Sequence, residues 1–332
     1  RSMIYPLNYE QKIGFDRIRI QLSGCCLSTL GKEMVDEMTF SAEKEHIEEQ
    51  LRRIKEFRFL LLSDEQEFPL IHFFDVRPSV KRIRLKNTYL NEQEFFDLLR
   101  SLQTISAIKQ YLSKCGADEA LLYPTLHRLT ENIEVFPEQI RLIDKTFDRH
   151  GHVKDTASKK LAELRSELKR MEGSIGRIMQ QVIRAAQQDG IVDKDAAPTL
   201  RDGRLMIPIQ PGMKRKFDGI VHDESASGHT LFVEPTAVVE ANNRIRELES
   251  EERQEIVRIL TALTDEFRPH TEDIINSYQL LADIDFIQAK AHLADNMNAI
   301  EPNIEKKPHI DWIDAVHPLL AQSLNKQGKQ VV

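Results

Sequence analysis

The sequence has few of the residues that would hold a chain together covalently or keep it unfolded. Only three of its 332 residues are cysteines, and Cys25, Cys26 and Cys115 lack the spacing of a disulfide framework or a zinc site. Glycine and proline number 13 each, while hydrophobic residues make up 41% and charged residues 30%. This composition is typical of a soluble, helix-rich globular protein, and the length allows about two domains.

Long hydrophobic runs are also missing. No apolar stretch approaches the ~18 residues of a membrane span, and the N-terminus lacks the basic and then apolar pattern of a signal peptide. Together with the unpaired cysteines, these absences predict a cytoplasmic protein without a membrane partner. Because the sequence stops at Val332 without a cap or a polar tail, we expect it to be part of a longer protein.

The signatures of common catalytic sites are absent from the sequence. It contains no G-x-x-x-x-G-K-[ST] phosphate loop, no G-x-S-x-G elbow and no H-E-x-x-H zinc motif. Two groups of histidines and acids stand out: the turn at residues 148–152 and, near the end, His309, Asp311, Asp314 and His317. A solvated turn explains the first group better than a metal site, and the second has no nucleophile beside it. The sequence therefore predicts no catalytic residue, metal ligand or cofactor in this chain.

Helical periodicity dominates the first half of the chain. Apolar residues recur at helical spacing over residues 13–30, 42–63 and 92–112, and Asn91 is a helix-start signal for the third of these segments. Prolines mark two further short helices, and a tight turn at residues 148–152 predicts two short strands around it. These elements predict a helical bundle.

A much longer helix is predicted after the bundle. Nine apolar residues from Ala157 to Ala185 are separated by alternating steps of four and three, which is the spacing of a coiled-coil seam. A helix over residues 155–188 would extend roughly 50 Å, which is more than a compact domain requires. We therefore expect it to project as an arm.

A second apolar seam supplies the partner of this arm. It runs from Val238 to Phe267, with Glu252 at one expected core position, where a polar residue costs stability but can fix the register. The predicted seam residues are Leu161, Leu164, Leu168, Met171, Ile175, Ile178, Val182, Ile245, Leu248, Ile256, Leu260 and Leu263.

The segment between the two long helices, residues 198–235, has a different character. Short β-type runs at residues 205–209, 217–221 and 230–233 are separated by glycine-containing turns. Helical spacing returns over residues 274–294. The predicted fold is mainly α: a helical bundle with an inserted, long antiparallel coiled-coil arm, tipped by a small antiparallel β-sheet.

Charge is unevenly distributed along the chain. The net charge of −7 argues against a dedicated nucleic-acid binder, yet residues 158–188 carry seven Lys/Arg against three Glu, and residues 201–217 carry five against one Asp. The second long helix is acidic, so the arm charges either contact phosphates or pair with that helix, and both readings stay open. For three adjacent cations at the tip, phosphate contact is favoured. The candidate nucleic-acid-binding residues are Arg201, Arg204, Lys214, Arg215, Lys216, Lys159, Lys160, Lys169 and Arg170.

Several segments resemble one known family. Residues 219–235 (GIVHDESASGHTLFVEP) and 238–248 (VVEANNRIREL) closely resemble the bacterial branch of the MutS family that lacks a mismatch-reading domain and usually ends in an Smr nuclease domain. Residues 153–158 (VKDTAS), 201–204 (RDGR) and 317–320 (HPLL) are similar to the same branch.

The resemblance implies a domain organisation. It implies a core and lever domain at residues 1–154 and 269–308, a clamp domain at 155–268 with its β tip at 198–235, and the start of an ATPase domain at 309–332. ATP and Mg would bind only to the rest of that ATPase domain, beyond this chain, and the endonuclease domain would also lie outside it. The chain itself should therefore be catalytically silent.

The resemblance leaves two functional hypotheses open. Members of this branch are described as dimeric ATPases that act on branched or recombination DNA, and as factors that separate stalled ribosomes. The chain would then be a clamp that holds DNA, or ribosomal RNA, by its phosphate backbone without sequence or mismatch specificity. Alternatively, it would be a lever and homodimerisation module whose clamp contacts the ribosome or another protein.

Overall fold

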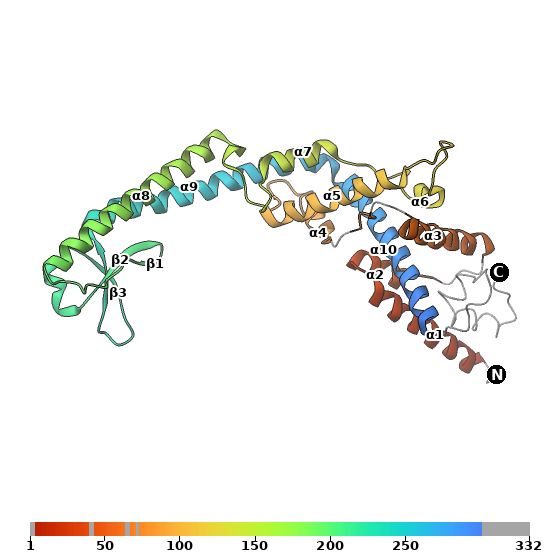
Figure 1. The fold of residues 1–332 in the computed structure, drawn as a ribbon, viewed down its shortest axis with the longest axis horizontal. Coiled ribbons are helices and arrows are strands. Elements are labelled where there is room, and N and C mark those ends of the chain that lie inside the picture. Colours follow the sequence, from red (N-terminus) through yellow and green to blue (C-terminus); the bar gives the residue numbers. More distant parts are fainter. Residues whose placement is uncertain (1–3, 40–42, 64–66, 71–72, 301–332) are drawn as a thin grey trace. The chain divides into compact units, whose positions relative to one another are not determined.

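The computed structural model describes residues 4–39, 43–63, 67–70 and 73–300, which form two compact units. Unit 1 comprises Arg1–Asp144 and Leu263–Val332, and unit 2 comprises Lys145–Ala262, so that unit 2 is an insertion in the sequence of unit 1. Helices predominate, and a single four-stranded antiparallel sheet lies in unit 2 (Figure 1). The predicted fold class is confirmed. The residues predicted to begin an ATPase domain, 309–332, lie outside the described residues, as do His309, Asp311, Asp314 and His317.

Unit 1 is a helical bundle built around one long helix, α10 (Thr271–Ile300). Helix α10 is buried around most of its circumference, which is typical of a helix with neighbours on several sides. Helices α1, α2, α3, α4 and α5 all contact it. The other helices of unit 1 are α1 (Ile4–Cys25), α2 (Thr29–Glu37), α3 (Lys44–Ser63), α4 (Arg77–Arg82), α5 (Glu92–Leu112), α6 (Pro124–Arg128) and α7 (Pro137–Thr146), the last of which ends in unit 2.

The single helix predicted over residues 13–30 is wrong, because the chain breaks between α1 and α2. Asp285 of α10 is fully buried, and its carboxylate accepts hydrogen bonds from the backbone N–H groups of Leu27 and Ser28, both at 2.9 Å, and from Ser28 Oγ at 2.6 Å. Ser28 in turn caps α2 by accepting from the Gly31 N–H at 3.2 Å. A carboxylate more than 250 residues away in the sequence thus ends one helix and starts the next.

Asp285 also explains why residue 31 is glycine. A Cβ atom on Gly31 would lie 2.2 Å from Asp285 Oδ2, closer than side-chain atoms can approach. Gly24, near the end of α1, has no such neighbour within 4 Å.

Substitution of Gly31 by alanine should therefore destabilise unit 1. The methyl group would displace the Asp285 carboxylate, and we expect the free energy of unfolding to fall by about 1–3 kcal/mol, measured by urea denaturation. Gly24→Ala is the matched control and should leave stability unchanged or slightly higher. Equal stabilities of the two variants would contradict the contact.

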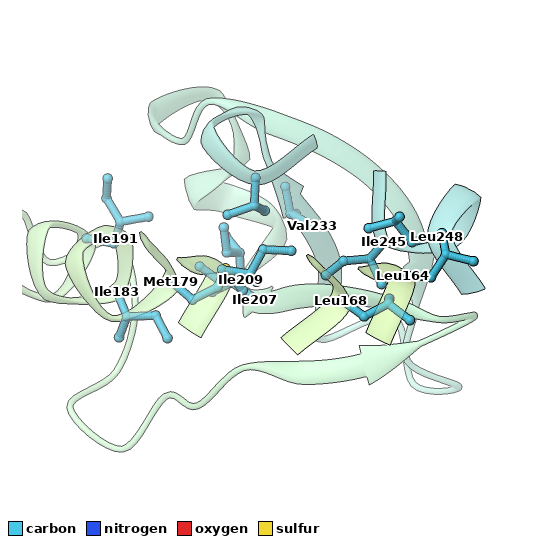
Figure 2. Packing of buried hydrophobic residues seen from close by; sticks show 13 residues of the cluster. Leu164, Leu168, Met179, Ile183, Ile191, Ile207, Ile209, Val233, Ile245 and Leu248 are labelled. Carbon is cyan, nitrogen blue, oxygen red and sulfur yellow. The ribbon is translucent and has the colours of Figure 1, made fainter. Parts of the chain in front are cut away.

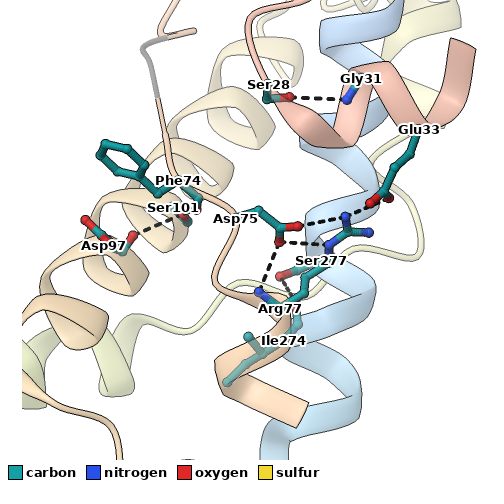
Figure 3. A network of polar contacts seen from close by, with 10 residues as sticks. All are labelled: Ser28, Gly31, Glu33, Phe74, Asp75, Arg77, Asp97, Ser101, Ile274 and Ser277. Atoms are coloured by element: carbon teal, nitrogen blue, oxygen red, sulfur yellow. Dashed lines mark hydrogen bonds and ion pairs between the residues drawn. The ribbon is translucent and has the colours of Figure 1, made fainter. Parts of the chain in front are cut away.

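A polar cluster at the start of α4 ties it to α2 (Figure 3). The Asp75 carboxylate accepts from the Arg77 backbone N–H at 3.0 Å and from its Nε at 2.9 Å, and Arg77 Nη2 donates to Glu33 of α2 at 2.8 Å. Hydrogen bonds to these two carboxylates raise the pKa of Arg77 despite its burial. The helix is thus fixed by a charged side chain at its first residue.

A second buried charge in α10 is a lysine. Lys290 is 4% exposed, donates to Gln50 Oε1 of α3 at 2.8 Å, and its Nζ lies 3.9 Å from the centre of the Phe286 ring. Burial, with the nearby positive charge of Arg53, lowers the pKa of Lys290 to about 7, although Asp283 opposes the change.

Unit 1 should consequently be stabilised by alkali. Between pH about 7 and the ordinary lysine pKa of 10.5, the unfolded chain binds a proton at Lys290 that the folded chain has released. The free energy of unfolding should rise with pH over that window, by up to about 1.4 kcal/mol per pH unit, and be lowest below it. Lys290→Met should flatten this slope and raise stability at neutral pH in urea titrations, whereas Lys55→Gln, on the exposed side of α3, should not. A slope that survives in the Lys290 variant would contradict this account.

Unit 2 consists of two long helices and the sheet. Helix α8 (Lys159–Gln188) follows a short turn at Asp155–Ala157, and α9 (Thr236–Phe267) runs beside it and ends in unit 1 (Figure 1). The strands are β1 (Thr199–Arg201), β2 (Arg204–Ile209), β3 (Gly219–Glu224) and β4 (Leu231–Pro235), in the order β1-β2-β4-β3 with all pairs antiparallel. The tight turn predicted at residues 148–152 is confirmed, but the strands predicted around it are reduced to one antiparallel bridge, Phe147 with Val153. The Asp148 carboxylate accepts hydrogen bonds from the backbone N–H groups of His150 and His152 within the turn.

The predicted seam of α8 is buried or half-buried from Leu161 to Val182, and Ile178 and Val182 pack against the apolar cluster of unit 2. In the second half of the helix the most deeply buried positions lie one residue further along than predicted. Leu161, Leu164, Leu168 and Ile175 are buried and Met171 is half-buried, but the buried row then moves to Met179, Ile183 and Ala186. Ile178 and Val182 are only half-buried, and Ala185 is exposed. Ile245, Leu248, Ile256, Leu260 and Leu263 of the α9 seam are all buried.

The sheet is the reason for this shift. Ile207 and Ile209 of β2 and Val233 of β4 join the same apolar cluster as Met179 and Ile183 (Figure 2). Steps of four, four and three residues follow the natural pitch of a straight helix, whereas a strict seven-residue repeat requires supercoiling around a partner helix. Where the partner changes from α9 to the sheet, the repeat changes with it.

The polar position in the seam is occupied as predicted. Glu252 is half-buried and accepts a hydrogen bond from Arg165 Nε of α8 at 3.0 Å.

None of the helices in the ranges that the structure describes is long and apolar enough to cross a membrane.

Candidate nucleic-acid interface

The tip cluster, which we define as Lys214, Arg215 and Lys216, lies on a short helical turn, η2 (Pro211–Lys216), between β2 and β3. Pro211 begins the turn, and Met213 and Phe217 pack against the apolar cluster and hold it to the sheet. All three basic side chains are exposed. Within the described part of the chain, none of them forms a hydrogen bond or an ion pair, so three positive charges stand side by side without compensation.

The other two predicted tip residues are compensated by neighbours in the sheet. Arg201 donates to Asp223 of β3 at 2.6 Å and lies 3.6 Å above the Phe232 ring. Arg204 donates to Glu234 of β4 at 2.7 Å and also bonds Asn243 of α9. Both arginines are thus paired within unit 2, and their contact with phosphate stays a prediction.

Glu234 is the centre of a polar network that joins four elements. Its side chain is 1% exposed, and besides Arg204 it contacts His222 Nε2 of β3 at 3.1 Å and Asn242 Nδ2 of α9 at 2.8 Å. A β-bulge between Val221 and Asp223 turns His222 toward it. Burial raises the pKa of Glu234, but hydrogen bonds from Arg204, Asn242 and His222 outweigh it and hold the pKa below its usual value.

Loss of this carboxylate charge should weaken the tip. Glu234→Gln leaves Arg204 without its anion in a largely buried site, and we expect the free energy of unfolding to fall by about 2–4 kcal/mol. The stabilisation should be present at neutral pH and be lost in acid, as the pH falls through the lowered pKa of Glu234. Asp223→Asn, in the more exposed pair with Arg201, is the control and should cost under about 1 kcal/mol. Urea unfolding of both variants compares them, and a smaller effect at Glu234 would contradict its central role.

Charges at the start of α8 pair with α9, as the second reading of the arm predicts. Arg165 bonds the Val153 carbonyl at 2.6 Å, Asp155 at 2.7 Å and Glu252 of α9 at 3.0 Å. Glu167 is paired with Arg244 of α9 at 3.3 Å. The pKa of the buried Glu255 is lowered, mainly by a hydrogen bond from Arg258. The exposed Lys160 is close enough to contribute to the same lowering.

The other basic side chains of α8 differ, because within the described residues they have no hydrogen-bond or ion-pair partner. Lys159 at the first residue of the helix, Lys169 and Arg170 near its middle, and Arg177 and Arg184 further along are all exposed. Arg177 and Arg184 contribute to the basic balance of the arm but are missing from the predicted interface. Arg170, Arg177 and Arg184 follow one another at steps of seven residues, which puts them on one helix face, and this spacing is the signal that would have included the last two.

Comparison with known proteins decides the family. No family model matches the chain. It is 33% identical over 310 residues to the endonuclease MutS2 of Geobacillus sp. (strain WCH70), a match that covers 93% of this chain and 39% of the relative. The chain belongs to the MutS2 family. It is similarly related to endonuclease MutS2 of Latilactobacillus sakei (34% identity, 92% of this chain and 38% of the relative) and of Enterococcus faecalis (32%, 93% and 38%).

This MutS2 chain spans about two fifths of the length of the relatives it matches. Those relatives are named endonucleases, whereas the described residues of this chain contain no group of three or more His, Cys, Asp or Glu that could hold a metal ion. The feature of the described residues that stands out is the group of exposed, unpaired basic side chains in unit 2.

Proposed function

We propose that this chain is the nucleic-acid clamp and lever region of a larger MutS2 protein. The tip cluster carries the proposal, since three adjacent cations with no partner in the described residues repel one another until an anion approaches. Phosphate groups of a nucleic-acid backbone provide such anions without any dependence on sequence. Lys159, Lys160, Lys169 and Arg170 on α8 would add to the same contact.

Mismatch reading is not part of this proposal. Mismatch-reading members of the MutS family use a Phe-x-Glu wedge, whose exposed aromatic ring unstacks a base step. This sequence contains two Phe-x-Glu patterns, which begin at Phe136 and Phe232. These side chains are only 4% and 8% exposed. The burial of both rings favours binding through the backbone alone.

The activities of the whole protein extend this proposal. Relatives are named endonucleases, and we infer that the complete protein has nuclease and ATPase activity, with ATP and Mg bound outside this chain. We further propose that it is a cytoplasmic homodimer that acts on branched DNA, with ribosomal RNA as the second candidate substrate.

A second candidate function follows from the acidic character of α9 and the net charge of −7. In this alternative, unit 2 contacts the ribosome or another protein, and the chain serves as a lever and dimerisation module. Such a contact would not lose strength or salt dependence when the charges of the tip cluster are removed.

Neutralising the tip cluster separates the two functions. Lys214→Gln/Arg215→Gln/Lys216→Gln should weaken binding to a DNA duplex and lower the slope of log K against log salt by up to about 2.7, because up to three phosphate contacts are lost. Fluorescence anisotropy over a salt titration measures both quantities. Lys55→Gln/Lys81→Gln/Lys86→Gln changes the net charge equally at exposed positions of unit 1 and should bind like the parent. If the tip variant also binds like the parent, the assignment of the tip cluster is wrong.

A further inference from the structure

The middle of α8 contains two glycines that the fold does not require. A Cβ atom added to Gly173 or Gly176 would meet no atom within 4 Å, so alanine would fit at both positions. Glycine inside a helix lowers stability relative to alanine, because more backbone freedom is lost on folding. Nothing in the described part of unit 2 accounts for this loss. A partner that approaches the helix backbone closely would account for it.

Three arginines lie on the same face of α8 as Gly173. Arg170, Arg177 and Arg184 are seven residues apart, so each is turned by only about 20° from the previous one and displaced by ~10.5 Å along the axis. Gly173 lies about 60° around the helix from Arg170 and about 40° from Arg177. We call the three arginines together with Gly173 the arginine row.

The arginine row faces away from the core of unit 2. Leu168, Ile175 and Met179 are buried on the opposite side of the helix. The three arginines are exposed, and within the described ranges none of them makes a side-chain hydrogen bond or an ion pair. Glu172, the one acid between Arg170 and Arg184 in the sequence, lies about 200° from Arg170 around the helix. From Arg170 to Arg184 the charges on this face are therefore all positive, which is complementary to a linear polyanion, and Glu163, seven residues before Arg170, marks the acidic end of the same line.

The absence of exposed aromatic rings narrows the partner to a duplex. Single-stranded nucleic acid is normally held by bases that stack on aromatic side chains. In the described part of unit 2, Phe147 and Phe232 are buried and Phe217 is half-buried against the apolar cluster. Unit 2 therefore offers no exposed Phe, Tyr or Trp ring as a stacking platform, whereas a paired duplex presents only phosphates and groove edges.

Because Gly173 has no side chain, the backbone of α8 can approach a groove closely there, which favours B-form DNA over A-form RNA as the partner. The major groove of B-DNA, about 12 Å wide, admits an α-helix, whereas the A-form major groove is too narrow for side chains to enter. We propose that α8 lays the arginine row along the major groove of double-stranded DNA, with Gly173 at the closest approach and the three arginines reaching phosphates on the groove rims. This rests on the proposed function and adds a second contact, separate from the tip cluster.

Charge and shape are tested by two variants of the 332-residue chain. In Arg170→Gln/Arg177→Gln/Arg184→Gln, binding to a DNA duplex should weaken about tenfold or more near ~0.1 M salt, with a shallower salt slope, because phosphate contacts are lost. Gly173→Gln adds a side chain at the point of closest approach. It should weaken duplex binding while raising the urea midpoint, since α8 itself becomes more stable. Gly24→Gln on α1 is the matched glycine control and should leave DNA binding unchanged.

The probes and the tip variant make the outcomes distinct. Each variant is titrated with a DNA duplex, an RNA duplex of the same sequence and an oligo(dT) strand, and only the first should respond to changes in the arginine row. If the row variants bind the DNA duplex like the parent while the tip variant does not, this inference is wrong and the proposed function stands. If the row variants weaken and the tip variant does not, the inference stands and the tip assignment fails. Equal losses on the RNA duplex would overturn the assignment to B-form DNA, and a parent chain that binds no nucleic acid overturns both proposals.

Discussion

The burial of one face of α8 against α9 and the sheet decides most of what unit 2 presents to its surroundings. Leu164 and Leu168 lie in one apolar cluster with Ile245 and Leu248, and the half-buried pair of Arg165 with Glu252 fixes their register. Because a helix has a fixed pitch, a choice of buried face is also a choice of outward face. The position of every charge on α8 follows from this packing.

The same packing sorts these charges into two classes. Near its first residue, α8 has acidic neighbours within reach, and Arg165 is bound by two carboxylates and a carbonyl. Towards its last residue, the neighbour is an apolar sheet that offers no such partner to Arg177 or Arg184. Pairing with α9 therefore accounts for Arg165, and phosphate contact stays a prediction for Arg177 and Arg184. An average charge over the whole segment could not have separated the two classes.

Features that depend on local periodicity could be predicted from the sequence, and those that depend on distant contacts could not. Helix α5 has the predicted bounds, residues 92–112, and Asn91 caps it with Glu94 in a reciprocal pair. The break at Ser28 depends on Asp285, which no local pattern connects to it. Strand β1 is missing from the predicted elements because it is only three residues long. The Asp202–Gly203 turn that follows it, with both residues at positive φ, is a hairpin signal that could have indicated it. For the candidate site, exposure of the tip cluster followed from its charge, whereas the pairing of Arg204 with Glu234 needed the fold of the sheet.

The network around Glu234 has a consequence for how such a tip can change over generations. Arg204, His222 and Asn242 share one carboxylate, so replacing any one of them alters the environment of the other two. We therefore expect a single substitution there to cost folding stability unless a second one compensates for it. Lys214, Arg215 and Lys216 share no partner in the described structure and can be exchanged one at a time. The charge of the tip can therefore change in small steps without disturbing the sheet that carries it.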